Sequence, residues 1–164
     1  MIQCSTSMSL HDALTNRNGP ISVLQVVHEP YVKNEFVTLT KGTPDSVGYD
    51  LHAAKQVIVE PGKREVVDTG VRITVPEGTY GQIAPRSSMA MQGIDIGAGV
   101  IDRDYTGVIK VMLVNHGEYP YCVNVGAKIA QLLLIRACND AEVVRVDSLE
   151  SSVRGDGGFG STGQ

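Results

Sequence analysis

The segment PRSS at 85–88 is the first whose residue types could do chemistry. Arg86 carries a planar guanidinium that can bind two phosphate oxygens at once. Ser87 and Ser88 add hydroxyl donors, and the free N–H groups at the start of a short helix favour an anion. Taken alone, however, this segment fits better a surface arginine beside an ordinary capped helix.

A second segment, GVIDRDYTG at 99–107, places two carboxylates between apolar stretches. Asp102 and Asp104 would face the same side of a strand, where such a pair can serve as a general base or bind a metal. They can equally cap a hairpin turn, where aspartate is common. Tyr105 adds a flat apolar surface with a polar tip, suited to a ligand or to packing at a hairpin.

Two further polar residues lie inside apolar stretches. Asp50 in GYDL at 48–51 needs an arginine, a backbone donor or a metal-bound water as its partner, because an unpaired buried charge is costly. Gln131 is the lone amide of KIAQLLL at 128–134, and a buried amide must also be satisfied. For Gln131 alone, a structural hydrogen bond is the simpler role.

The chain closes with RGDGGFGSTGQ at 154–164, which by composition is a disordered glycine-rich tail. Phe159 lies among these glycines with no apolar run nearby, five residues after Arg154. A glycine-rich segment can close over a ligand because its N–H groups can approach phosphates. A phenylalanine in that position can stack on a base.

Strands must position these segments, because the apolar runs are short, rich in Val and Ile, and separated by turn signals every ten residues or so. This rhythm predicts an all-β, jelly-roll-like β-sandwich or barrel. One short helix is expected at 87–93, capped by Ser87 or Ser88 and ended by Gly93. The expected strands lie at 36–40, 49–54, 56–60, 64–75, 80–85, 108–115, 121–125, 128–135 and 142–146, and a further strand is possible at 21–27.

The length of 164 residues suits a single domain, expected over 34–153. Residues 1–33 lack strong periodicity and are expected to be a partly mobile N-terminal extension. Residues 154–164, the C-terminal arm, are expected to be flexible and to close over the active site. The sequence assigns no role to the N-terminal extension.

Composition narrows the class of partner and the compartment. The net charge of −4 argues against binding to long nucleic acid, and no apolar run approaches membrane-spanning length. The odd number of cysteines and the lack of a CxxC pattern argue against a zinc site and a disulfide framework. An intracellular protein of the cytoplasm or nucleus is therefore expected, since the N-terminus lacks a secretory signal, while organelle targeting stays open.

Five segments, taken together and in order, resemble the five motifs of the trimeric dUTPase family over roughly residues 36–164: GYDLHAA, PRSSMA, GVIDRDYTG, KIAQLLL and RGDGGFGSTG. The resemblance implies a jelly-roll homotrimer in which each active site takes parts from all three subunits. It also implies hydrolysis of dUTP to dUMP and pyrophosphate with Mg²⁺ as cofactor.

The resemblance further implies a role for each segment. Asp102 resembles the residue that deprotonates the water attacking the α-phosphorus, and Tyr105 resembles the residue that stacks beneath deoxyribose and excludes a 2′-hydroxyl. Asp50 resembles the carboxylate that holds a Mg²⁺-bound water. The remaining implied substrate contacts are Gly99, Val100, Ile101 and Lys110 at the uracil edge, Arg86, Ser87, Ser88 and Gln131 at the phosphates, and Arg154, Phe159, Gly160 and Ser161 in the C-terminal arm.

The chain departs from the family pattern at Ala127 and Lys128, where an acidic residue and an arginine usually precede IAQL. The lost acid could weaken a turn or a subunit contact. One alternative is the related dCTP deaminase family, which shares the trimeric fold and a PRSS segment, although the hairpin and tail follow the dUTPase pattern. Another is a dUTPase fold that only binds or signals, which the full set of implied catalytic residues argues against.

Overall fold

The computed structural model of the chain describes residues 24–32, 39–138 and 140–155. Over these residues the fold is all-β with one short helix, which confirms the predicted fold class. The elements in chain order are β1 (Gln25–His28), β2 (Tyr49–His52), β3 (Val57–Val59), β4 (Arg64–Asp68), β5 (Val71–Thr74), β6 (Thr79–Ala84), α2 (Ser87–Ala90), β7 (Ile94–Ile96), β8 (Val100–Ile101), β9 (Lys110–Asn115), β10 (Tyr121–Val123) and β11 (Lys128–Arg136).

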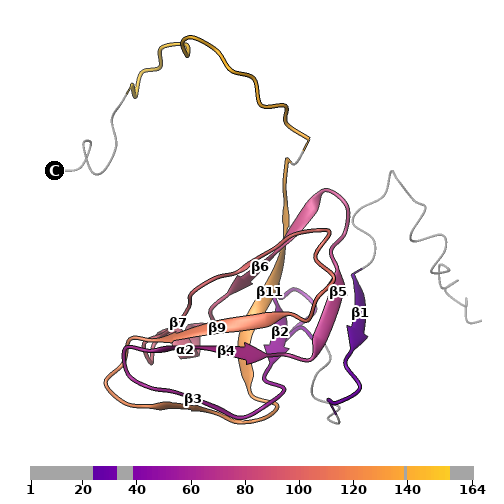
Figure 1. Cartoon of the computed structure of the whole chain (residues 1–164), viewed down its shortest axis with the longest axis vertical. Coiled ribbons are helices and arrows are strands. Elements are labelled where there is room, and N and C mark those ends of the chain that lie inside the picture. Colours follow the sequence, from indigo (N-terminus) through magenta and orange to yellow (C-terminus); the bar gives the residue numbers. More distant parts are fainter. Residues whose placement is uncertain (1–23, 33–38, 139, 156–164) are drawn as a thin grey trace, which may run out of the picture.

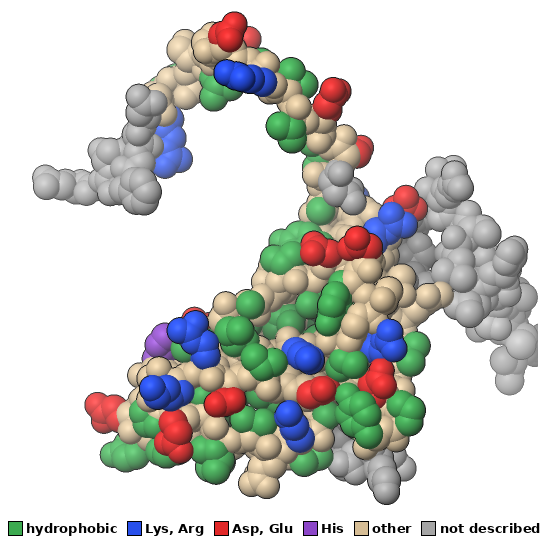
Figure 2. Space-filling model, in the orientation of Figure 1, with side chains coloured by type: hydrophobic (Ala, Val, Ile, Leu, Met, Phe, Trp, Pro, Cys, Tyr) green, Lys and Arg blue, Asp and Glu red, His purple; other side chains and the backbone are tan. Residues whose placement is uncertain are grey.

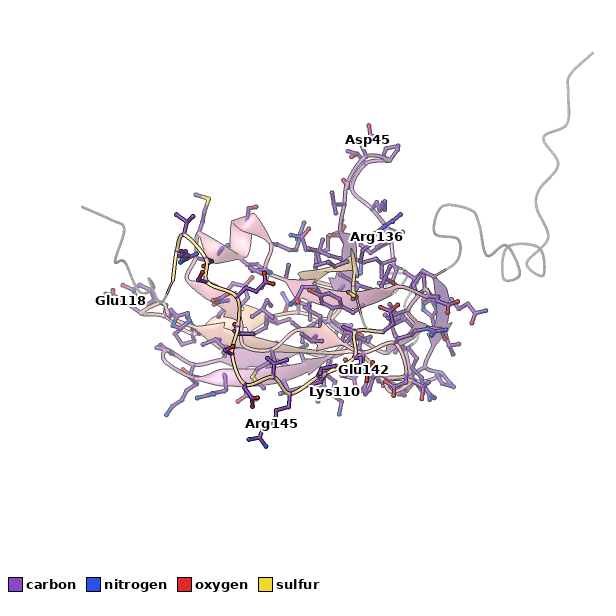
Figure 3. All side chains as sticks on the ribbon, turned by 90° about the horizontal axis from the view of Figure 1, so that it is seen from above. Asp45, Lys110, Glu118, Arg136, Glu142 and Arg145 are labelled. Carbon is purple, nitrogen blue, oxygen red and sulfur yellow. The ribbon has the colours of Figure 1, made fainter. Side chains whose placement is uncertain are left out.

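Two antiparallel sheets form the body of the molecule. One has four strands in the order β2-β11-β6-β8, and the other has three in the order β4-β9-β7. Figure 1 shows β9 and β4 crossing in front of β11, and the view from above in Figure 3 shows the strands in layers. Two-stranded sheets formed by β1-β5 and by β10-β3 complete the fold. This layering is the jelly-roll-like arrangement expected from the sequence.

Alternating side chains of these strands form the core. Every second residue of β6 and of β9 is buried, as expected for strands with one face on a core. Leu51 of β2 and Leu132 of β11 are 1% and 0% exposed, and burial of each stabilises the fold by about 1.5–3 kcal/mol. These leucines lie next to Asp50 and Gln131 in the chain, so core packing fixes where the two polar residues stand.

Part of the segment assigned to the N-terminal extension belongs to the body. β1 pairs antiparallel with β5, from Gln25 opposite Thr74 to His28 opposite Val71. Residues 1–23 lie outside the described part of the chain. Among the described residues, no helix has the length and the apolar character needed to span a membrane.

The strand predicted at 142–146 is wrong. These residues form no strand, and Val143 is 97% exposed. Figure 1 shows the chain leaving the end of β11 and running away from the body, and Figure 2 shows apolar side chains along this exposed stretch. An apolar, β-branched run favours a strand only where another strand offers backbone groups to pair with, and this segment has no such neighbour within the described chain.

Two other differences concern strand boundaries. The single strand predicted over 64–75 is divided into β4 and β5, because Gly70 adopts a left-handed conformation with φ of 65°. The short strand β7 was not predicted. Of the strand predicted at 36–40, residues 36–38 lie outside the described residues, and Thr40 forms an isolated bridge with Asp50.

Candidate active site

A polar cavity of about 380 Å³ opens between the loop before β2, the start of α2 and the beginning of β11. Figure 3 shows Asp45 at the tip of this loop, which stands away from the sheets. The cavity contains five of the residues predicted for the site, drawn from three separate motifs. Its lining residues are Gly42, Ser46, Gly48, Asp50, Arg86, Ser87, Ser88, Lys128 and Gln131.

The sheet order explains how distant motifs meet here. β11 lies between β2 and β6, and its Gln131 is opposite Asp50 on one side and Ala84 on the other. Arg86 follows Ala84 by two residues, so it enters the same region from the end of β6. Cross-strand partners share one face of a sheet, which is why Asp50 and Gln131 both line the cavity.

A β-bulge at the start of β11 adds Lys128 to this face. Lys128 is opposite His52 and Gln131 is opposite Asp50, so β11 has one residue more than β2 in this interval, taken up between Lys128 and Ala130. Residues three apart on a regular strand face opposite sides, but the extra residue turns Lys128 to the side of Gln131. Sequence reasoning treated Lys128 only as a departure from the family pattern and missed it as a site residue.

Asp50 is the electrostatic centre of the cavity. It is 8% exposed, and its Oδ2 lies 2.7 Å from Lys128 Nζ while its Oδ1 lies 3.5 Å from Arg86 Nε. The expectation that this carboxylate needs a partner such as an arginine is therefore met by two cations. Two positive groups on one carboxylate leave a net positive charge in the cavity, which suits a polyphosphate.

Gln131 makes the structural hydrogen bond expected from its burial, because its Nε2 donates to Pro85 O at 2.9 Å. The bond ties β11 to the residue before Arg86. Gly48 leaves the space that Gln131 occupies, since a Cβ atom at Gly48 would lie 2.9 Å from Gln131 Cβ and closer still to its Oε1. A side chain at position 48 would therefore displace this amide.

The helix α2 is shorter than predicted and is capped differently. Arg86 is its N-cap residue, in an extended conformation and with no side-chain cap hydrogen bond, so the prediction that Ser87 or Ser88 caps the helix is wrong. Both serines are instead helical residues that line the cavity. Met89 is buried and anchors the helix to the core. The helix ends at Ala90 with Met91 as its C-cap, so the predicted end at Gly93 is wrong; Gly93, with φ of 78°, ends the turn that follows the helix.

Asp102 and Asp104 lie in a turn, because β8 ends at Ile101. Tyr105 N donates to Asp102 O at 3.1 Å, which closes the turn. The premise that both carboxylates lie on a strand is therefore wrong, because both stand in the turn that follows β8. Tyr105 Oη donates to Val108 O at 2.9 Å, while the residue stays 42% exposed.

The predicted uracil-edge residues flank this turn. Gly99 O accepts a hydrogen bond from Ile83 N at 2.7 Å, and a Cβ atom at Gly99 would lie 2.6 Å from Ile83 O. Val100 is exposed and Ile101 is buried, as expected for neighbours on a strand. The next strand along the chain, β9 of the three-stranded sheet, begins at Lys110, which is exposed.

A single chain does not bring all the predicted residues together. Neither Asp102 nor Tyr105 is among the described residues that line the cavity around Asp50. Arg154 is exposed and belongs to the segment after β11. Figure 1 shows this segment running away from the body. The remaining predicted arm residues, Phe159, Gly160 and Ser161, lie outside the described residues.

His52 is a buried neighbour of the cavity that the sequence did not single out. It is 7% exposed and lies two residues after Asp50 on the same face of β2, and its Nδ1 has no hydrogen-bond partner among the described residues. Burial lowers the pKa of its imidazole below the usual value, and the negative charge of Asp50 opposes that shift only in part. Its spacing from Asp50 was the signal available in the sequence.

Comparison with known proteins gives this geometry a context. The dUTPase family model matches residues 34–163. The deoxyuridine 5'-triphosphate nucleotidohydrolase of Eremothecium gossypii is 52% identical over 125 residues, which are 76% of this chain and 82% of that protein. The corresponding protein of variola virus is 48% identical over 148 residues, which are 90% of this chain and 96% of that protein.

The fold has close counterparts among solved structures. The dUTPase of Staphylococcus bacteriophage 80alpha with dUPNHPP matches with a TM-score of 0.77 and 27% sequence identity. The match covers 87% of this chain and 99% of that one. The overall fold is therefore shared with a dUTPase solved with dUPNHPP.

Proposed function

Because this chain belongs to the dUTPase family and hydrolyses dUTP, we propose that the cavity around Asp50 binds the triphosphate of that substrate. The observation that carries the proposal is the meeting of Arg86 and Lys128 on one buried carboxylate, with Ser87, Ser88 and Gln131 on the same wall. Asp50 holds the two cations in place before the substrate arrives, so the phosphates need not reorganise them.

The turn after β8 supplies the chemistry in this proposal. Asp102 orients and deprotonates the water that attacks the α-phosphorus, and pyrophosphate leaves in line. Tyr105 packs beneath the deoxyribose, where a 2′-hydroxyl would meet the ring. Backbone groups from Gly99 to Ile101 and near Lys110 read the uracil edge, so cytosine leaves groups unpaired and the methyl group of thymine is excluded by size.

The separation of Asp102 from the cavity supports a shared active site. A water activated by Asp102 must lie within hydrogen-bond reach of that carboxylate and next to the α-phosphorus. One chain offers the phosphate cavity and the turn at different places, so we propose a homotrimer in which the turn of one copy faces the cavity of another. The C-terminal arm of the third copy, with Arg154 and Phe159, then covers the nucleotide.

The donor set of the cavity fits a Mg²⁺ ion that arrives with the substrate. Asp50 is the one carboxylate among the described lining residues, and the described chain holds no group of three or more His, Cys, Asp or Glu side chains that could bind a metal. Mg²⁺ is commonly held by substrate phosphates and waters with one or two carboxylates. Asp50 would hold a water of that ion, which would supply positive charge at the phosphate oxygens.

A substrate panel tests this function. Release of pyrophosphate is measured for dUTP, dTTP, dCTP and UTP, and release of ammonia is measured for dCTP in the same samples. We expect pyrophosphate from dUTP, far slower release from the other three nucleotides, and no ammonia. Ammonia from dCTP would support the deaminase alternative, and failure to hydrolyse any of the four would support a binding role.

A further inference from the structure

Arg72 of β5 connects the N-terminal part of the chain to the loop that carries Tyr105. Its Nε donates to Thr106 O at 2.7 Å, and its Nη1 lies 3.5 Å from Glu29 Oε1. Thr106 directly follows Tyr105, so the guanidinium holds the backbone on one side of that ring. One planar guanidinium makes both contacts, which the ammonium group of a lysine could not reproduce with the same geometry.

The Glu29 end of this connection is well fixed. Glu29 N donates to Gly70 O at 2.9 Å directly after the pairing of β1 with β5. The side chain of Glu29 is 20% exposed and that of Arg72 is 45% exposed, so their ion pair is screened less than a fully exposed pair. Glu29 lies before the residues matched by the family model, which begin at 34.

The base of the same loop is fixed by Val71 of β5 and by Thr69, which precedes that strand. Ile109 N donates to Val71 O at 2.8 Å, and Thr69 Oγ1 donates to Ile109 O at 2.7 Å. The bond from Arg72 to Thr106 fixes the middle of the loop, between this base and the turn at Asp102. The position of the Tyr105 ring therefore depends on the guanidinium of Arg72, and Glu29 of the N-terminal segment orients that guanidinium.

We propose that Arg72 and Glu29 are positioning residues for Tyr105, and that the N-terminal segment thereby sets how strongly the enzyme discriminates deoxyribose from ribose. The inference rests on the proposed role of Tyr105. Without the Arg72 bond the loop backbone at Thr106 relaxes, the ring moves away from the sugar, and a 2′-hydroxyl meets less resistance. Small displacements of a group that orients substrate have large kinetic effects.

The test uses the full-length protein and measures kcat/KM for UTP and for dUTP. We expect Arg72→Gln to raise the UTP-to-dUTP ratio by about 10-fold, and Glu29→Gln to raise it by about 3-fold because Arg72 keeps its bond to Thr106. Arg72→Lys keeps the charge but loses the shared geometry. The UTP-to-dUTP ratio should therefore rise in Arg72→Lys by more than half of its rise in Arg72→Gln. Arg64→Gln, which changes an exposed arginine on β4, is the matched control and should leave the ratio unchanged.

A double-mutant cycle separates positioning from a general loss of stability. Arg72→Gln added to Tyr105→Ala should give no further rise in the ratio, because the positioned group is already gone.

If Tyr105→Ala raises the ratio while Arg72→Gln and Glu29→Gln leave it within two-fold of the wild type, the inference is overturned and the proposed function stands. If Tyr105→Ala also leaves the ratio unchanged, the proposed role of Tyr105 fails, and the inference fails with it. Should Arg72→Gln not fold, Glu29→Gln alone decides by the same criterion.

Discussion

The carboxylate of Asp50 and the ammonium group of Lys128 lie 2.7 Å apart, on neighbouring strands of the four-stranded sheet. Arg86 Nε lies 3.5 Å from the other oxygen of the same carboxylate. The buried carboxylate therefore keeps two cations close together, although they would repel each other without it. This arrangement gives a net positive charge to the cavity in which we propose that the triphosphate binds.

Replacing Asp50 by asparagine should destabilise the protein as well as weaken substrate binding. The change leaves Lys128 and Arg86 side by side without a counter-charge, and we expect the free energy of unfolding to fall by about 1–2 kcal/mol, since both cations are partly exposed. Urea denaturation measures the loss. Asp45→Asn, at the tip of the projecting loop (Figure 3), is the control and should change stability little. Equal stability of the two variants would contradict a structural role for the Asp50 carboxylate.

Gly48→Ala should lower kcat/KM for dUTP by about 10²-fold, because the new methyl group would occupy the space of the Gln131 amide. The displaced amide would lose its bond to Pro85 O, which ties β11 to the segment before Arg86. Gly42→Ala, in the same loop, is the matched control because its Cβ would meet Ser46 Oγ at an ordinary 3.6 Å. A loss as large in Gly42→Ala as in Gly48→Ala would show that the loop, and not Gln131, is responsible.

His52 should make stability depend on pH below neutrality. Burial lowers the pKa of its imidazole in the folded state, so the unfolded chain binds a proton more readily than the folded one. The stabilising contribution is complete above the ordinary pKa of about 6.5 and is lost as pH falls through the lower folded value. Urea midpoints measured from pH 8 to pH 5 should decline less steeply in His52→Gln than in the wild type. The exposed His116 provides the control, since His116→Gln should leave the slope unchanged.

Asp102→Asn should slow turnover of dUTP by about 10²–10⁴-fold, the range of a lost general base. Binding of a non-hydrolysable dUTP analogue should remain close to normal, because the asparagine keeps the shape of the side chain. Asp104→Asn is the natural control, since Asp104 belongs to the same turn. A single-turnover measurement separates the chemical step from product release. Near-normal turnover in Asp102→Asn would remove this residue from the catalytic role.

The strands and the cavity differ in how far the sequence determines them. Short apolar runs bounded by turn signals place β6, β9 and β11 close to their observed bounds. The side-chain period of two in a regular strand hides Lys128, since it places Lys128 on the side opposite Gln131. The bulge between Lys128 and Ala130 brings Lys128 to the same side as Gln131. The segment KIAQLLL contains no turn residue that would predict this bulge.

The sequence also could not predict which strand a segment pairs with or which residue takes a cap position, because tertiary structure decides both. The run EVVRV at 142–146 has the composition of a strand, but composition does not say which strand it pairs with, and within one chain it stays exposed. The serines of PRSS are good cap residues by type. Arg86 takes the cap position instead, so both serines are left to line the cavity.

The proposed shared active site makes a prediction about mixtures of two inactive proteins. One protein carries Asp102→Asn, and the other is truncated after Val153 and so lacks the C-terminal arm. If the site takes its turn and its arm from different copies, mixed trimers contain some sites with an intact Asp102 and an intact arm.

The two proteins are denatured together, refolded, and assayed for release of pyrophosphate from dUTP. We expect activity well above that of either protein refolded alone, because each chain supplies what the other lacks. Mass spectrometry under native conditions confirms that mixed trimers have formed, and mixing the two proteins after separate refolding is the control. If mixed trimers form and no activity returns, turn and arm act within one chain, and the exposed segment after β11 must fold back onto its own body.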